Sequence, residues 1–374
     1  MQTFDAIVVG TGGVGSAAAM HLAARGASVL GLDRFPPGHD RGSSHGQTRV
    51  IRMAYYEHPD YVPLLRRAYQ LWETLEQVVG EKLYYEVGLL QVGPPDGPVL
   101  SGARASALKY QLELESLSAE EVSRRFPGLV CHAPFEGVFE RHAGYLAVEA
   151  CVVAHAKEAV RYGAQLHEGE TVISWRPDGE GVQVETDRAV YAAKRLIVTA
   201  GAWTRELMLD LGVPLEVLRK PLYWFAPKAD APRNTNWPCY LYDLPEGCFY
   251  GSPQLDDRGV KVAQHSGGDP VTNPLQVDRS LDENDCDSVK RFVKSYLPTT
   301  STNLTAQATC MYTMTPDKNF IVGKHPRYPQ VSFAAGLSGH GFKFTGVLGE
   351  ILSELALDDA TKLPIEFLSP ARFS

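Results

Sequence analysis

The sequence predicts an α/β protein in which a dinucleotide-binding domain is interleaved with a second, sheet-rich domain. An apolar run, Phe4–Val9, leads into a glycine-rich turn and a helix of small residues. A second apolar run, Arg195–Ala200, also ends in a glycine turn, and the segment between 218 and 269 is rich in aromatic residues and proline. The 374 residues are enough for two domains or one large elaborated one.

Residues 4–33 contain the strand, turn, helix, strand and acid of a dinucleotide-binding unit. Gly10 permits a tight turn, Gly12 lets the backbone approach a pyrophosphate, and Gly15 lets the helix pack on the strand. Asp33 ends the second strand, where it can accept ribose hydroxyls and disfavours a 2′-phosphate. A glycine-rich turn without a nucleotide is the alternative, and the motif does not separate FAD from NAD. The predicted cofactor site also includes Gly13 and Arg34.

Periodicity predicts the remaining elements. Apolar residues at helical spacing predict helices over 61–79, 103–110, 118–126, 148–162, 203–211, 282–297 and 344–357. Ser118 caps the third of these predicted helices. Apolar and β-branched runs predict strands within 83–92, 135–139, 166–168, 171–175, 181–186, 189–192, 195–200, 320–322 and 330–335.

The order of these elements predicts a discontinuous architecture. The nucleotide domain is expected to comprise 1–82, 148–217 and 305–374, and the substrate domain 83–147 and 218–304. A nicotinamide dehydrogenase usually has one continuous nucleotide domain, so the interleaving favours an FAD domain with an inserted substrate domain.

Composition excludes several classes of function. The net charge of −8 gives no reason to expect a nucleic acid or an anionic membrane as partner. No run has transmembrane length, and the first apolar stretch has no basic leader. The six cysteines form no C-x-x-C pair, so neither a zinc or other metal site nor a disulfide framework is indicated. Reduced thiols favour the cytoplasm.

Four further segments carry a family resemblance. They are Ser43–Arg52, Ala200–Trp203, Cys310–Asp317 and Gly339–Lys343. With the glycine fingerprint, they make the whole chain similar to the monomeric sarcosine oxidase and N-methyltryptophan oxidase family of FAD-dependent amine oxidases. The resemblance implies a Rossmann-like FAD domain with a mixed-sheet substrate domain, as in the glutathione-reductase-like flavoprotein oxidases. It also implies a monomer.

The resemblance implies that Cys310 forms a thioether to the 8α-methyl group of the flavin. From the sequence alone, a cysteine before Met-Tyr-Thr reads as a buried small hydrophobe. The glycine-rich turn before the last helix suits negative charge on the reduced flavin. The other flavin-side residues implied by the resemblance are His45, Arg49, Gly201, Gly339, Gly341, Phe342 and Lys343.

Arg52 and Lys343 are the implied partners of a substrate carboxylate, with Gly339 beside them. Arginine offers a planar pair of donors to a carboxylate. A surface or domain-linking salt bridge is the alternative for Arg52. Arg49 and Arg52 point to opposite faces if their segment is extended, and the resemblance places Arg49 beside the flavin.

The segment Lys261–His265 has strand character, with Lys261 and His265 on one face. Tyr250 lies eleven positions before Lys261, across a turn, which is hairpin spacing. The resemblance implies that Lys261 activates oxygen and that His265 and Tyr250 line the substrate pocket. Unaided, an exposed strand lysine and an ordinary strand histidine are the plainer interpretation.

The predicted reaction is oxidative demethylation of an N-methyl amino acid, of the sarcosine or N-methyltryptophan type, by FAD and O₂. Its products are formaldehyde, the amino acid and H₂O₂. A cyclic amino acid such as proline or pipecolate, or a glycated amino acid, is the alternative substrate. A nicotinamide dehydrogenase would leave Cys310 without a purpose, and a flavin carrier without catalysis would need neither Lys261 nor Lys343.

Overall fold

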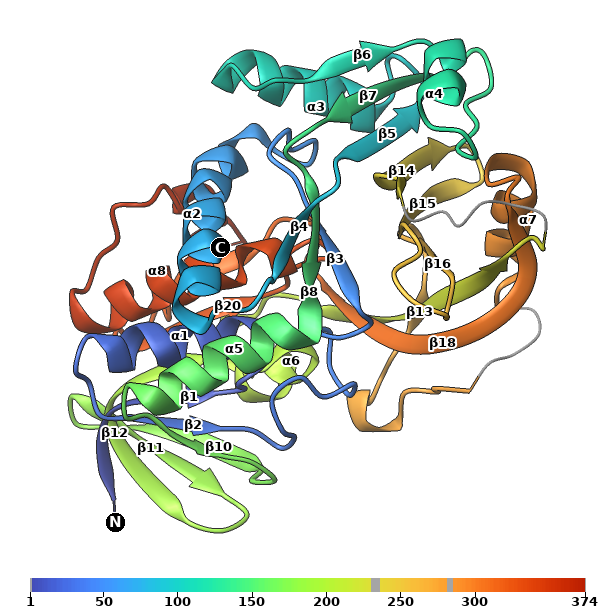
Figure 1. Ribbon diagram of the computed structural model, residues 1–374. Coiled ribbons are helices and arrows are strands. Elements are labelled where there is room, and N and C mark those ends of the chain that lie inside the picture. Colours follow the sequence, from blue (N-terminus) through green and yellow to red (C-terminus); the bar gives the residue numbers. More distant parts are fainter. Residues whose placement is uncertain (1, 230–235, 281–284, 374) are drawn as a thin grey trace.

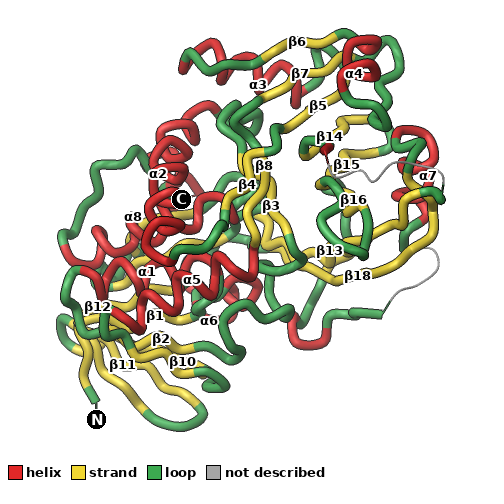
Figure 2. The backbone as a smooth tube through the Cα atoms, in the orientation of Figure 1, coloured by secondary structure: helices red, strands yellow, loops and turns green. Residues whose placement is uncertain are grey.

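The computed structural model describes residues 2–229, 236–280 and 285–373. Two large sheets stand on either side of a small three-stranded one, and a group of helices covers the first large sheet (Figures 1 and 2). In the described residues, no helix is long and apolar enough to cross a membrane.

The first sheet has eight strands around a parallel core in the order β9-β2-β1-β12-β20. The core strands are β1 (Thr3–Val9), β2 (Val29–Leu32), β9 (Gln165–His167), β12 (Val190–Val198) and β20 (Val331–Ala335). The antiparallel additions are β10 (Val172–Asp178), β11 (Gly181–Thr186) and β19 (Ile321–Lys324).

A group of buried helices covers one face of this sheet (Figure 1). They are α1 (Gly13–Ala24), α2 (Val62–Val79), α5 (Val148–Arg161) and α8 (Thr345–Leu357). Glycine 349 allows α8 to approach α1 closely, because a Cβ there would lie 2.6 Å from the Ala17 Cβ. The amino termini of α1 and α8 also lie together, because a Cβ on Gly13 would lie 2.8 Å from Thr345, and α1 begins just after the carboxyl end of β1.

The second sheet has nine strands in the order β17-β13-β16-β15-β14-β5-β7-β6, with β18 beside β13. Their bounds are β5 (Leu89–Gly93), β6 (Glu115–Leu117), β7 (Glu136–Glu140), β13 (Glu216–Pro227), β14 (Cys239–Leu244), β15 (Gly247–Ser252), β16 (Val260–Gln264), β17 (Asp269–Pro270) and β18 (Thr300–Met314). Three helices flank it: α3 (Pro98–Tyr110), α4 (Ala119–Arg125) and α7 (Asp287–Tyr296).

The small sheet joins the two halves of the molecule. It consists of β3 (Thr48–Ile51), β8 (Gly144–Ala147) and β4 (Tyr84–Glu86). Because β3 follows the polar loop after β2, this sheet fixes Arg49 and Arg52 between the two large sheets.

Most predicted elements are confirmed, including the Ser118 cap, which forms a full capping box with Glu121. Three predictions need correction. The helix expected over 203–211 is broken into η2 (Gly201–Trp203), α6 (Thr204–Leu207) and η3 (Leu209–Leu211). The runs 189–192 and 195–200 belong to a single strand, β12. The helix expected from residue 282 begins at Asp287, and residues 282–284 of that prediction lie outside the described residues.

The predicted domain boundaries stay predictions. Two of them fall inside strands, because β13 spans the boundary at 217 and β18 spans the boundary at 304. These two strands pair antiparallel along nearly their whole length. The strand that carries Cys310 is thereby continuous with the substrate-side sheet.

Candidate cofactor and active site

One continuous cavity runs from the carboxyl ends of β1 and β2 to the second large sheet. Gly10, Gly12 and Asp33 line one end, and His265 and Lys343 line the other. The cavity therefore joins the predicted nucleotide residues to the predicted substrate residues.

The glycine fingerprint forms a cradle at the first end. Gly10 has a φ of +86°, and a Cβ on it would lie 2.7 Å from the Thr199 carbonyl oxygen. A Cβ on Gly15 would lie 1.8 Å from the Gly10 carbonyl oxygen. A Cβ on Gly12 would meet nothing within 4 Å, so the space in front of the amino terminus of α1 is open. This arrangement fits a pyrophosphate bound to the helix amino terminus.

Asp33 and its neighbours complete the nucleotide end. The Asp33 carboxylate accepts the Thr11 amide at 2.6 Å and the Phe35 amide at 2.9 Å, which fixes it at the rim of the cavity. Arg34 also lines the cavity, with its Cζ 5.9 Å from the centre of the Trp203 ring. Its buried Nη1 has no hydrogen-bond partner among the described residues. Gly201 and Gly13 also line the cavity. A Cβ on Gly13 would lie 2.8 Å from Thr345, so this position has little room for a side chain. The amino terminus of α1, the Asp33 carboxylate and the Arg34 guanidinium together fit the adenosine diphosphate part of FAD.

Cys310, the predicted flavin-linked cysteine, lies beside Arg49. Arg49 Nη2 donates to the Cys310 Sγ at 3.2 Å and to the Ser43 carbonyl oxygen at 3.0 Å. The thiol is buried and stands just behind the wall that its neighbours Met311 and Tyr312 form. The Arg49 guanidinium and the Cys310 sulfur are therefore held together at the cavity wall.

His45 is buried in the same loop. Burial, followed by the charge of Arg49, lowers the pKa of His45 to about 4, so the ring is neutral at neutral pH. Its Nε2 atom has no hydrogen-bond partner among the described residues. Gly46 has a φ of +93°, a backbone conformation that favours glycine.

The expected hairpin brings Lys261, Tyr250 and His265 to one face of the second sheet. Tyr250 pairs with Ala263 across β15 and β16, so it shares a face with Lys261 and His265. Tyr250 and His265 line the cavity, whereas Lys261 lies behind its wall.

Lys261 is one of the largest fully buried side chains. Its ammonium donates to the carbonyl oxygens of Gly46 at 2.6 Å and Thr48 at 2.8 Å, and to the Thr48 hydroxyl at 3.2 Å. Burial, followed by the charge of Arg49, lowers its pKa. The plainer interpretation, an exposed strand lysine, is therefore wrong.

The glycine turn before α8 closes the far side of the cavity, where Gly339, Gly341, Phe342 and Lys343 line it. Gly339 has a φ of +81°, and a Cβ there would lie 2.4 Å from the Tyr312 ring. The Tyr312 hydroxyl in turn lies 3.3 Å from His265 Nδ1. Burial lowers the pKa of His265 to about 3, which keeps the ring neutral.

Arg52 is bound to a carboxylate of its own chain. Its Nη2 donates to both oxygens of Glu57, at 2.6 and 2.7 Å, and both residues line the cavity. The pair is largely buried, so the surface-bridge interpretation of Arg52 does not hold. Burial would raise the pKa of Glu57, but the charge of Arg52, with those of His340 and Lys343, lowers it to about 2.

Lys343 lies near Arg52 and is almost fully buried. Its ammonium donates to the His340 carbonyl oxygen at 2.6 Å. Burial, followed by the charge of Arg52, lowers its pKa to about 7. The structure thus brings together the two cations predicted to hold a carboxylate.

Three residues of this region escaped the sequence analysis: Tyr55, Glu57 and Lys220. Lys220 donates to the carbonyl oxygens of residues 265, 266 and 267 at 2.9 to 3.0 Å and pairs with Cys310 across β13 and β18. Three carbonyl acceptors specify an ammonium, which has three donors. No local sequence pattern marks these residues. Their places in the site depend on partners far away in the sequence or on the path of the loop after β3.

Part of the wall near the predicted substrate residues is apolar. Val50, Leu89 and Leu241 line the cavity beside Tyr56 and Tyr250. This wall gives an alkyl or aromatic part of a ligand a place to pack beside the charged groups.

Comparisons with known proteins agree with this geometry. A profile of FAD dependent oxidoreductases matches residues 5–355. A monomeric sarcosine oxidase of Streptomyces avermitilis is 42% identical over 100% of this chain and 98% of its own length. An N-methyl-L-tryptophan oxidase of Yersinia pestis is 34% identical over 99% of both chains. The structure of NikD, an unusual amino acid oxidase essential for nikkomycin biosynthesis, superposes with a TM-score of 0.86 at 27% identity, covering 99% of this chain and 98% of that one. The chain belongs to the FAD-dependent oxidoreductase family, in the group of the monomeric sarcosine and N-methyl-L-tryptophan oxidases.

Proposed function

We propose that this protein is an FAD-dependent oxidase that removes the methyl group of an N-methyl amino acid. The reaction converts the secondary amine, O₂ and water into the primary amine, formaldehyde and H₂O₂. The observation that carries the proposal is the pair Arg52 and Lys343, two cations suited to an amino acid carboxylate, in the cavity that begins at the glycine fingerprint. The flavin, when bound, supplies the two-electron oxidation of the amine and passes the electrons to O₂.

The chain's own residues would orient the substrate. Arg52 and Lys343 hold its carboxylate, and the apolar wall of Val50, Leu89 and Leu241 packs against its side chain. His265 is neutral, so it would place no positive charge beside the amine. Only the unprotonated amine has a lone pair to support loss of hydride, so a neutral ring beside it is suitable.

Two further residues would act on the flavin or on its reaction with O₂. Cys310 would form the thioether to the 8α-methyl group of the flavin, and the Arg49 guanidinium lies 3.2 Å from its sulfur. Forming that bond would release two protons, one from the thiol and one from the methyl group, and the flavin would pass the two electrons to O₂. Lys261 supplies a fixed buried cation that favours the superoxide formed in the first electron transfer to O₂.

We further propose that the protein is a cytoplasmic monomer. All six cysteines are free, which supports a reducing compartment. Light scattering of the purified protein would test the monomer, with a dimer mass as the contradicting result.

The direct test is anaerobic mixing of the purified yellow protein with sarcosine or N-methyl-L-tryptophan. We expect the flavin absorbance to bleach with at least one of them, and not with glycine or tryptophan at the same concentration. Bleaching by proline or by a glycated amino acid alone would overturn the choice of substrate class. Absence of bleaching with every amine tested would overturn the proposal that the protein is an amine oxidase.

A further inference from the structure

Tyr55 contacts both cations of the carboxylate site. The centre of its ring lies 4.2 Å from Arg52 Cζ and 5.1 Å from Lys343 Nζ. The side chain is fully buried, so the attraction between the ring face and each cation is weakly screened. One aromatic ring thus fixes the spacing between the two charges.

The hydroxyl of Tyr55 is held by His340. Tyr55 Oη lies 2.5 Å from His340 Nδ1, and His340 Nε2 lies 2.9 Å from the Lys318 carbonyl oxygen. A carbonyl oxygen only accepts, so the proton of the neutral ring is on Nε2. Nδ1 must then accept, and Tyr55 must donate to it. The lone pairs of the tyrosine oxygen remain for Lys343 Nζ, 3.5 Å away.

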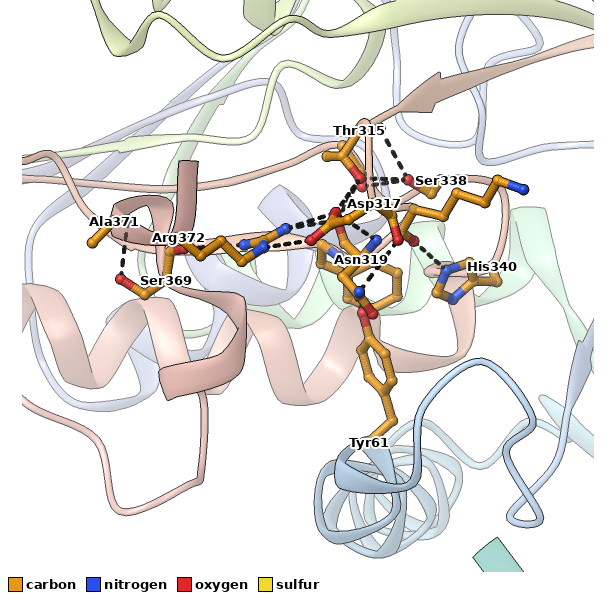
Figure 3. A network of polar contacts seen from close by, with 12 residues as sticks. Tyr61, Thr315, Asp317, Asn319, Ser338, His340, Ser369, Ala371 and Arg372 are labelled. Carbon is orange, nitrogen blue, oxygen red and sulfur yellow. Dashed lines mark hydrogen bonds and ion pairs between the residues drawn. The ribbon is translucent and has the colours of Figure 1, made fainter. Parts of the chain in front are cut away.

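The loop that presents the Lys318 carbonyl is itself anchored (Figure 3). Asp317 accepts from Thr315 Oγ1 and the Asn319 amide, both at 3.1 Å. Arg372, in the carboxyl-terminal segment, donates to Asp317 at 2.8 Å and to the Asn319 carbonyl oxygen at 3.1 Å. A chain of polar contacts therefore extends from the carboxyl-terminal segment to the carboxylate site.

We propose that Tyr55 and His340 are positioning residues that align Arg52 and Lys343 for a carboxylate. This inference rests on the proposed function only in taking that carboxylate to be the substrate's. His340 sets the direction of the Tyr55 hydroxyl, and Tyr55 holds the two cations at a fixed spacing. Neither residue takes part in the redox step.

The test is a titration of the holoenzyme with acetate, which has a carboxylate and no amine. Binding is followed by the change in flavin absorbance and by the rise in melting temperature, neither of which requires turnover. Tyr55→Phe keeps the ring and removes the hydroxyl. The matched control is Tyr61→Phe, because Tyr61 is equally buried in the same aromatic cluster but its hydroxyl accepts the Phe320 amide instead.

We expect Tyr55→Phe to weaken acetate binding about fivefold, the effect of one neutral hydrogen bond. With an oxidised amine, KM should rise by a similar factor while kcat stays within about twofold. Tyr61→Phe should lower the melting temperature and leave the acetate Kd within about twofold. His340→Asn, whose Oδ1 can replace the accepting Nδ1, should bind acetate better than His340→Leu.

Equal acetate affinity in the wild type and Tyr55→Phe would overturn the inference, as would an equal loss in Tyr61→Phe. Wild-type protein that binds no acetate would overturn it as well. The failures are distinguishable: an enzyme that binds acetate in this pattern but oxidises no amine would contradict the proposed function and leave the positioning roles intact.

Discussion

Arg52 and Glu57 form a two-pronged ion pair inside the cavity, with both Glu57 oxygens within 2.7 Å of Arg52 Nη2. Glu57 therefore occupies one of the guanidinium nitrogens that a substrate carboxylate could use. A substrate carboxylate must displace Glu57 or bind at the remaining donors of the guanidinium. Either arrangement lowers the affinity for the substrate.

Replacing Glu57 by glutamine should remove this competition. We expect Glu57→Gln to bind acetate about tenfold more tightly at pH 6, because the guanidinium loses a charged partner. The acetate-free variant should melt at a lower temperature, since breaking a buried ion pair costs about 3–5 kcal/mol. Calorimetric titration and thermal melting measure the two effects. Arg52→Ala is the control and should weaken acetate binding, whereas a Glu57→Gln variant that binds acetate no better would show that Glu57 does not compete.

The protonation of Lys343 should set the pH dependence of carboxylate binding. Its pKa is lowered to about 7, so the site gains a charge below that pH and loses it above. The pKa values of its neighbours Glu57 and His340, about 2 and about 4, lie outside this range, as does the raised pKa of Arg52. Acetate affinity should fall about tenfold from pH 6 to pH 9, the size of one charge-assisted hydrogen bond. Lys343→Met should bind acetate with little pH dependence, and an equally steep profile in that variant would assign the titration to another group.

The buried ammonium of Lys261 should matter more for oxygen than for the amine. We expect Lys261→Met to slow reoxidation of the reduced enzyme by O₂ at least a hundredfold, while reduction by amine slows less than tenfold. Stopped-flow absorbance measures both steps separately. Lys220→Met removes another buried ammonium of the same sheet and should change the two rates by similar factors. Equal effects of Lys261→Met on both steps would remove Lys261 from the oxygen reaction.

Cys310 should hold the flavin covalently. Acid precipitation of the wild-type protein is expected to leave a yellow pellet, and Cys310→Ala should release the flavin into the supernatant. Cys248→Ala is the matched control, because Cys248 is another free thiol on the second sheet and should leave the flavin attached. Free flavin from the wild type would contradict the linkage.

Sequence reasoning was strongest where local physics decides the structure. Gly10 needs a positive φ, Gly15 needs the absence of a Cβ, and the apolar runs around them need burial. These constraints act within about thirty residues, so they can be read from the sequence. The same holds for α2, whose buried residues repeat with the helical period.

The long strand β18 is not predicted from the sequence. Residues 300–309 are mostly polar or small and show no clear alternation, because β13 supplies their hydrogen bonds and one face stays partly exposed. Likewise, β12 was divided into two runs because its first half pairs with β11 and its second half with β20, which gives each half a different pattern of burial.

The motifs predict the cations Arg52, Lys261 and Lys343 of the candidate site, but not Glu57, Lys220 or the pairing of these groups. Arg52 and Lys343 were named from the motifs, while Glu57 and Tyr55 depend on the path of the loop after β3. Lys261 looked exposed in the sequence, and only the fold of the loop at residues 46–48 provides the three oxygens that permit its burial. The assigned roles of these residues remain predictions for the experiments above.

The central claim is tested most directly by measuring H₂O₂ and formaldehyde released from N-methyl, cyclic and glycated amino acids in air. We expect sarcosine or N-methyl-L-tryptophan to give the two products in equal amounts, together with the demethylated amino acid. Peroxide without formaldehyde, from a cyclic or glycated substrate only, would contradict the account, and so would the absence of peroxide from all of them.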